Sequence, residues 1–181
     1  MEKVKFKVVI GSWGSYNECN ERALGSKWLN FAEFDTWEEI EEELIKEGFE
    51  LEGIDEELFI QDISEDMGFD CDYMHPQRLF NILNESEILK SDYYFEKALA
   101  FIEAYGWNDF VQLVEEWGDS WDCDVCYYSG YDWEELGKEI FEEMGYNLPD
   151  YLENYFDFER YGEDLSDEGY IETFYGIIFR Y

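Results

Sequence analysis

The stretch Tyr131–Glu168 reads YDWEELGKEIFEEMGYNLPDYLENYFDFERYGEDLSDE, and it decides how the chain is organised. Fourteen carboxylates lie within it, against two basic side chains, Lys138 and Arg160. A regular apolar pattern runs through the same residues at the spacing of one helix face. Its members are Trp133, Leu136, Ile140, Phe141 and Met144. The acidic residues therefore belong to a folded segment and not to a disordered tail.

The ends of this helix are also marked in the sequence. Asp132 is a good N-cap, Glu135 stands at the capping-box position, and Gly145 is placed to end the helix in a left-handed turn. The sequence thus predicts a helix over 132–144 whose buried face holds its carboxylates in a fixed array.

The whole chain of 181 residues is strongly acidic, with 47 Asp and Glu against 12 Lys and Arg and a formal net charge of −35. Apolar residues make up 46% and aromatic residues 20%, which excludes a disordered chain of low hydrophobicity. Such a charge repels nucleic acid and anionic membranes and attracts basic surfaces. We therefore expect a basic protein partner, no nucleic-acid ligand and no membrane. The alternative interpretation is a surface adapted to solubility or to high salt.

No signal peptide and no apolar run long enough to span a bilayer stands out, so a cytoplasmic location is expected. For a chain without a secretory signal, four cysteines are expected to be free thiols. They are Cys19, Cys71, Cys123 and Cys126.

Alternation and end signals predict an α+β fold. Its first part is an antiparallel sheet with one helix, and a long loop covers 11–26. Strands are expected at Lys3–Ile10, Lys27–Phe31 and Leu58–Ile63, and the helix at Thr36–Glu47. For this helix Thr36 is the cap, Glu39 stands at the capping-box position and Gly48 follows the end. Its apolar face is formed by Trp37, Ile40 and Leu44.

The rest of the chain is expected to be mostly helical. Helices should begin at Pro76, at Ser91 or Asp92, and at Asn108, with a further helix from Pro149 to about Leu165. A short strand is expected within Asp122–Ser129, and a terminal hairpin around Tyr175–Gly176. We expect three small domains along an elongated body: an antiparallel sheet plus helix over 1–66, a helical middle over 67–106, and a mixed α/β part over 107–181.

Cys123-x-x-Cys126 is the nearest approach to a chemical motif. Neighbouring Asp residues disfavour a thiolate, and a zinc site would need two further ligands. We expect a buried structural pair. No EF-hand, phosphate loop or nucleophile elbow is present, and His75 beside Pro76 is expected to be a turn residue and not a base. The sequence thus predicts no catalytic residue, no metal site and no cofactor.

The charge also bears on shape. B-DNA carries one charge per roughly 1.7 Å of axis, so a net charge of −35 corresponds to about 60 Å of duplex. A compact chain of this length has a radius of gyration near ~16 Å and a diameter of about 40 Å. To match the linear charge density of DNA, the body has to be elongated.

Three segments resemble the ArdA family of antirestriction proteins: IGSWGSYNECNERALGSKW (10–28), ELFIQDI (57–63) and YLENYFDFERYGEDLSDEGYIETFYGIIFRY (151–181). Residues 70–120 match it only in character, and the Cys-x-x-Cys is not a feature of the resemblance. The resemblance implies an elongated, dimeric mimic of bent B-form DNA that is carried on mobile genetic elements. It also implies that the protein acts in the bacterial cytoplasm on the DNA-binding cleft of type I restriction–modification enzymes, formed by their specificity and methyltransferase subunits.

On this hypothesis the partner-binding groups are carboxylates on exposed helix faces, and no enzyme activity is expected. They are Glu38, Glu39, Glu42, Glu43, Glu115, Glu116, Glu134, Glu135, Glu139, Glu142, Glu143, Asp157, Glu159, Glu163 and Asp164. The contact of a homodimer is expected among Tyr151, Tyr155, Phe156, Phe158 and Tyr161. The rival hypotheses are an acidic module for another basic DNA-binding or nucleoid protein, and an enzyme or metal buffer that uses Cys123 and Cys126.

Overall fold

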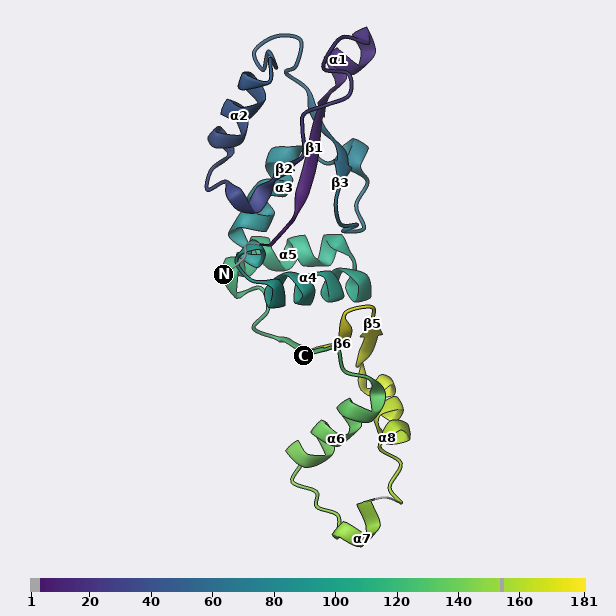
Figure 1. Ribbon diagram of the computed structural model, residues 1–181. Helices are drawn as coiled ribbons and strands as arrows, with labels where there is room; N and C mark the ends of the chain where they lie inside the picture. The colour runs from purple at the N-terminus through teal and green to yellow at the C-terminus, as the bar shows by residue number, and fades with distance from the viewer. Residues whose placement is uncertain (1–3, 154) are drawn as a thin grey trace.

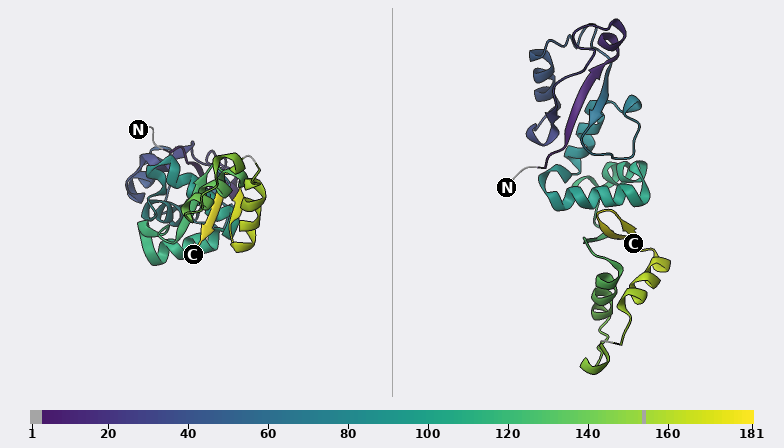
Figure 2. Two further views of the ribbon diagram at one scale, coloured as in Figure 1. Left: turned by 90° about the horizontal axis from the view of Figure 1, so that it is seen from below. Right: turned by 45° about the vertical axis from the view of Figure 1, so that its right-hand side comes forward.

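The computed structural model describes residues 4–153 and 155–181 and has a mixed α+β fold, as predicted. Its outline is long from the side and compact when seen along the long axis (Figures 1 and 2). The accessible surface of 10865 Å² exceeds the roughly 9,300 Å² expected for a compact monomer of this mass. Among the described residues, no helix combines the length and the apolar character needed to cross a bilayer.

The first sheet has the strand order β2-β1-β3, with β1 at Lys7–Ser12, β2 at Leu29–Asn30 and β3 at Leu58–Ile63. Both pairs are antiparallel. The prediction for β3 is confirmed to the residue. The strand predicted at Lys3–Ile10 begins later, at Lys7, and Lys3 itself lies outside the described residues. Strand β2 is only two residues long. The chain leaves β2 early because Asn30 caps a 3₁₀ turn at Phe31–Glu33, where its side chain accepts a hydrogen bond from the Ala32 amide.

The loop predicted over 11–26 contains a short helix, α1, at Trp13–Glu18. Ser12 caps it, and Cys19 ends it in the left-handed region with φ 51°. Gly14 suggested a loop in the sequence, but it lies inside this helix. A Cβ at Gly14 would overlap the carbonyl oxygen of Ile54, so the glycine is needed for close packing and not for a turn.

The helix predicted after Thr36 is confirmed as α2, Trp37–Lys46. Thr36 and Glu39 form the predicted capping box, and Trp37, Ile40 and Leu44 are buried. This helix lies beside the first sheet (Figure 1).

The middle of the chain is helical, as predicted. It contains α3 at Pro76–Glu85, α4 at Asp92–Tyr105 and α5 at Trp107–Trp117, with 3₁₀ turns at Cys71–Tyr73, Ile88–Lys90 and Gly118–Ser120. The predicted start of α5 at Asn108 is wrong, because the helix follows Gly106 directly, and this glycine takes a φ of 95° that only glycine adopts readily. Trp117, the last residue of α5, is half exposed.

The C-terminal part has a second sheet and three helices. Its strands have the order β4-β6-β5, all antiparallel: β4 at Val125–Ser129, β5 at Ile171–Thr173 and β6 at Gly176–Arg180. The predicted terminal hairpin is thus confirmed, and it also pairs with β4. The helices are α6 at Trp133–Glu143, α7 at Asp150–Glu153 and α8 at Phe158–Asp164, followed by a 3₁₀ turn at Leu165–Glu168.

The single helix predicted over 149–165 is wrong. Asp157 begins a new helix there, because its side chain accepts a hydrogen bond from the Arg160 amide at 3.0 Å. An N-cap of this kind competes with continuation of the preceding helix.

Two hydrophobic cores meet at the second sheet. The larger runs from Val4 to Tyr127 and includes Ile178, and the smaller contains Leu136, Ile140, Leu165 and Ile177. Because successive side chains of a strand point to opposite faces, Ile177 and Ile178 place β6 in both cores. Figure 1 accordingly shows this sheet between α4 on one side and α6 on the other. The division of the chain into three domains stays a prediction.

Candidate partner-binding surface

The acidic side chains of α2 divide into structural and free groups. Glu39 accepts hydrogen bonds from the amides of Asp35 and Thr36 at 2.8 and 3.4 Å, so it closes the helix start. Glu43 is half-buried between Lys27 and Lys46, whose ammonium groups lie 3.1 and 2.7 Å from its oxygens. The remaining predicted groups of this helix, Glu38 and Glu42, are exposed.

On α5, both predicted carboxylates are exposed. A guanidinium nitrogen of Arg78 lies 3.7 Å from Glu115, an exposed pair in which solvent screens the attraction. For Glu116 no such neighbour is seen among the described residues.

Helix α6 carries five of the predicted carboxylates, and all five are exposed. Glu135 completes the capping box with Asp132, and Glu134 pairs with Lys138 at 2.8 Å. The others are Glu139, Glu142 and Glu143.

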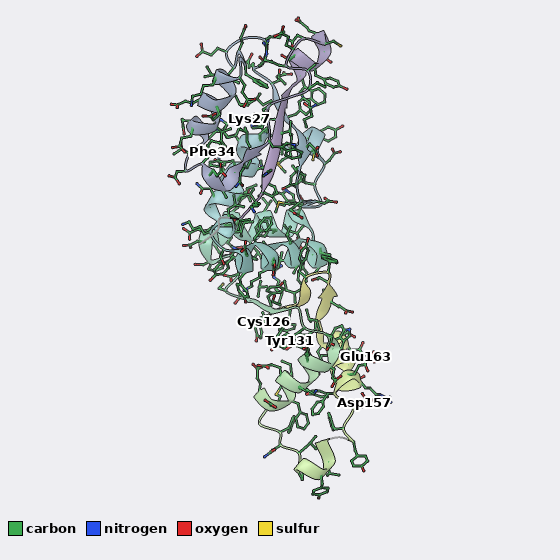
Figure 3. The ribbon with its side chains drawn as sticks, viewed as in Figure 1. Lys27, Phe34, Cys126, Tyr131, Asp157 and Glu163 are labelled. Atoms are coloured by element: carbon green, nitrogen blue, oxygen red, sulfur yellow. The ribbon has the colours of Figure 1, made fainter. Side chains whose placement is uncertain are left out.

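Helix α8 and its cap carry the last four predicted groups. Asp157 is the N-cap, and its side chain also faces solvent. Figure 3 shows Asp157 and Glu163 at the outer side of the lower part of the molecule. Glu159 and Asp164 are exposed on the same helix.

A glycine contact brings the carboxylates of α6 and α8 together. A Cβ at Gly137 would overlap the carbonyl oxygen of Phe158, and a Cβ at Gly162 would overlap that of Trp133. The two helices therefore touch backbone to backbone, closer than the 8–10 Å between axes that side chains usually impose. The sets on α2 and α5 lie farther along the body, so the predicted groups form a series along its length (Figure 1).

The local electrostatics reflect this negative surface. The Glu139 carboxylate, together with partial burial, raises the pKa of Tyr131 above its usual value. Hydrogen bonds to Glu43 and Glu47 raise the pKa of Lys27. Negative charge next to a phenol disfavours its ionisation, and next to an ammonium it favours the charged form.

Two carboxylates serve the interior and not the surface. Asp55 is fully buried and accepts hydrogen bonds from the Ser15 hydroxyl, from Arg22 Nε at 2.9 Å and from the Glu50 amide at 2.8 Å. The buried Lys97 ammonium lies 2.7 Å from Asp122. These pairs engage two of the twelve basic residues, the buried Lys97 and Arg22, whose side chain is 22% exposed.

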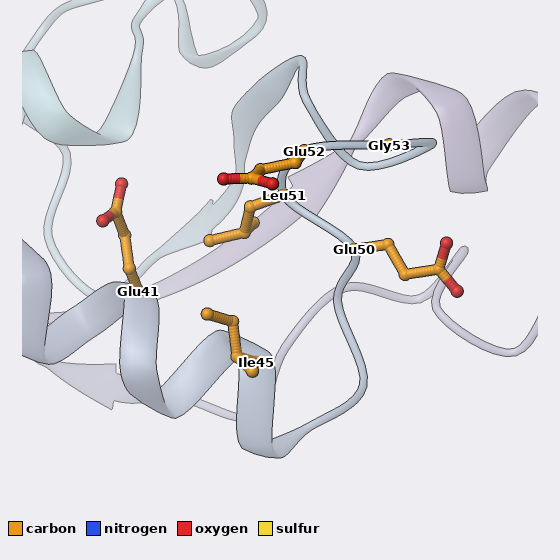
Figure 4. A pocket seen from close by; sticks show the side chains of 6 residues that line it. All are labelled: Glu41, Ile45, Glu50, Leu51, Glu52 and Gly53. Carbon is orange, nitrogen blue, oxygen red and sulfur yellow. The ribbon is translucent and has the colours of Figure 1, made fainter.

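Sequence reasoning missed an acidic pocket of about 630 Å³ between α2 and the turn that follows it (Figure 4). Glu41, Glu50 and Glu52 surround apolar side chains of Ile45 and Leu51. Glu41 also accepts a hydrogen bond from the Trp37 indole at 2.7 Å. The role of Glu41 could not be predicted from the run EEIEEE (38–43), because helical spacing does not tell which of several carboxylates faces a neighbouring turn.

The expected burial of the cysteine pair is wrong. Cys123 is exposed and Cys126 is half-buried at the start of β4, with its sulfur 3.5 Å from the hydroxyl of Tyr181. Cys123 lies in the turn before β4, and Cys126 stands on the strand between the buried Val125 and Tyr127, so its side chain points to the opposite face of the sheet. No group of His, Cys, Asp and Glu suited to a metal ion occurs in the described part of the chain. His75 caps α3 by accepting a hydrogen bond from the Gln77 amide, as a turn residue does.

The five residues expected at a dimer contact fall into two groups. Tyr151 and Tyr155 are largely exposed. The rings of Phe156, Phe158 and Tyr161 pack on Phe141 with centroids 4.9, 5.7 and 5.9 Å away, so they also form part of the packing between α6 and α8.

The comparison with known families gives one finding. The sequence model of a family described as antirestriction protein (ArdA) matches residues 8–179. No curated protein matches the chain. The family match extends through residues 70–120, where the resemblance read from the sequence was only one of character.

Proposed function

The chain belongs to the ArdA family of antirestriction proteins, and from this premise we propose that it is a DNA mimic that competes with DNA for the binding cleft of type I restriction–modification enzymes. The observation that carries the proposal is the series of exposed carboxylates along an elongated body, from α2 through α5 to α6 and α8. A body of this kind offers a DNA-binding cleft the charge that it normally meets on phosphates.

The proposed mechanism is binding without chemistry. Lys and Arg in a DNA-binding cleft gain most of their affinity by neutralising phosphates and releasing condensed counterions. Carboxylates fixed on packed helices can replace the phosphates without the entropy cost of ordering a flexible acidic chain. The capping boxes of α2 and α6 and the glycine contact between α6 and α8 hold the carboxylates in place.

A homodimer would lengthen the charged body. We propose that the two copies meet around α7, where Tyr151 and Tyr155 are exposed next to the ring cluster around Phe141. Exposed aromatic side chains are common at protein interfaces. Sedimentation that shows only monomer at micromolar concentration would remove this part of the proposal.

Competition is the direct test of the proposed function. A fluorescent DNA duplex is bound to a purified type I methyltransferase, and the chain is then added. We expect it to displace the duplex, and to displace DNA from a histone-like nucleoid protein much more weakly. Equal displacement from both would favour a general acidic module, and no displacement from the methyltransferase would reject the proposed function.

A further inference from the structure

A groove of about 540 Å³ lies between the loop that follows β3 and the junction of α4 with α5. Two accessible rings line it: the half-buried Phe69, which packs on the buried Trp107 with centroids 4.9 Å apart, and Tyr73, which extends at the rim with 89% of its surface exposed. A tyrosine so exposed gains little by burial in the folded chain. It is free to cover a ligand in the groove.

The groove also carries charge. The carboxylates of Asp70 and Asp109 line it together with one basic residue, Arg78. The guanidinium of Arg78 lies 3.7 Å from Glu115, which is outside the groove, and solvent screens this exposed pair. Two carboxylates against one guanidinium leave the lining of the groove with a formal net charge of −1.

Backbone dipoles do not reverse this balance. The C-terminus of α4 and the N-terminus of α5 meet at Gly106, on the wall of the groove. The partial charges of the two helix ends have opposite signs and offset each other. The acid groups and the negative field of the whole chain therefore decide which charge the groove attracts.

We propose that this groove binds an arginine side chain of the basic partner. A guanidinium stacks on aromatic faces and pairs with a carboxylate at its edge, and the groove presents both in the same place. The proposal rests on the proposed function only in that the DNA-binding cleft supplies the arginine. The groove would add a contact between guanidinium and aromatic ring, which a DNA phosphate cannot make. Salt screens this contact less than it screens an exposed charge pair.

The groove can be tested without any enzyme. The ¹⁵N-labelled full-length chain is titrated at fixed ionic strength with N-acetyl-arginine amide and, separately, with the neutral N-acetyl-citrulline amide. We expect saturable shifts for the arginine compound at the amides of Gly106, Trp107 and Asn108, and none for citrulline. Arginine shifts spread evenly over all acidic helices, or equal shifts with citrulline, would overturn the proposal. Saturable binding of N-acetyl-glutamate amide at the start of α5 would also overturn it.

Matched variants separate the ring contact from the bulk charge. Tyr73→Ala removes the ring at the rim without changing net charge, and Phe174→Ala is its control because Phe174 is equally exposed but does not line the groove. We expect Tyr73→Ala to weaken arginine binding about 2- to 5-fold, the range given by a cation–π contact of ~0.5–1 kcal/mol. Asp109→Asn should weaken it as well, whereas Asp92→Asn, in the first turn of α4, should not.

The same variants distinguish this proposal from the proposed function. If the chain displaces the duplex and Tyr73→Ala does so as well as Phe174→Ala, the groove proposal is wrong and DNA mimicry stands. If the groove binds arginine but the chain displaces no duplex, the proposed function fails and the arginine site stands. The proposal is supported when Tyr73→Ala alone loses potency against the methyltransferase by the factor that it loses for the arginine compound.

Discussion

At the scale of single residues, Asp55 shows that a carboxylate in this acidic chain can be structural. Burial acts to raise its pKa, but the hydrogen bonds from Ser15 and the Glu50 amide and the charge of Arg22 outweigh it, so the pKa lies below the usual value. A carboxyl group with a lowered folded-state pKa stabilises the fold above its unfolded pKa of about 3.9, and this stability is lost as the pH falls through the folded pKa.

We therefore expect Asp55→Asn to lower the free energy of unfolding at pH 7 by about 3 kcal/mol, because it leaves Arg22 without its buried partner. Urea denaturation measures this. Glu56→Gln, at an exposed neighbouring carboxylate, is the control and should change stability by less than ~0.5 kcal/mol. The loss for Asp55→Asn should shrink when the pH is lowered below about 4, and a loss that is independent of pH would contradict the ionised state of Asp55.

At the scale of elements, the predictions succeeded where local signals and burial agree. The helices α2 and α6 have caps, an apolar face and a terminal glycine in the sequence, and both appear with their predicted capping boxes. The break between α7 and α8 was missed because Asp157 looks like one more acidic residue until its side chain is seen to cap a helix. Gly137 gave no signal either, since the need for glycine inside α6 comes from a helix that lies some twenty residues farther along the chain.

The contact between α6 and α8 leads to a prediction at this scale. Gly137→Ala would stabilise an isolated helix by roughly 0.5–1 kcal/mol, but here the new Cβ overlaps the Phe158 carbonyl. We expect a net loss of about 1–3 kcal/mol, as for other overpacked sites, together with weaker competition against DNA at unchanged net charge. Urea unfolding followed by tryptophan fluorescence and the duplex competition assay measure the two effects. Gly53→Ala, where a Cβ meets only ordinary contacts, should affect neither, and a Gly137→Ala protein of normal stability would show that the close approach is not required.

At the scale of the whole molecule, charge and shape act together. The net charge of −35 is too large to be explained by any one site, and a surface larger than that of a compact monomer spreads it along the body. The sequence predicted the charge and the need for elongation, and fourteen of the fifteen carboxylates that it predicted at the surface are exposed. It did not tell which carboxylates are already engaged, because engagement depends on partners such as Lys27, which reaches Glu43 from the segment before β2.

If many weak carboxylate contacts add up to the affinity for the partner, inhibition should weaken step by step as more carboxylates are neutralised. Glu139, Glu142 and Glu143 are exposed on α6 and take no part in its capping box. One substitution, Glu142→Gln, should change the inhibition constant by about twofold, since an exposed charge pair contributes ~0.5 kcal/mol. The triple Gln variant should weaken inhibition roughly tenfold on the same scale. It should also reduce the slope of log affinity against log salt by about 2.7, if each carboxylate replaces one phosphate.

The matched control for the triple variant removes the same charge from three exposed carboxylates in different places, Glu33, Glu56 and Glu87. If only the net charge mattered, the scattered variant would weaken inhibition as much as the α6 variant does. If the DNA-binding cleft recognises the ordered row of carboxylates on α6, the α6 variant loses more affinity than the scattered variant, because three neighbouring contacts with basic side chains disappear together. An inhibition constant that does not change with salt, in any of these proteins, would mean that the partner recognises something other than a phosphate-like charge.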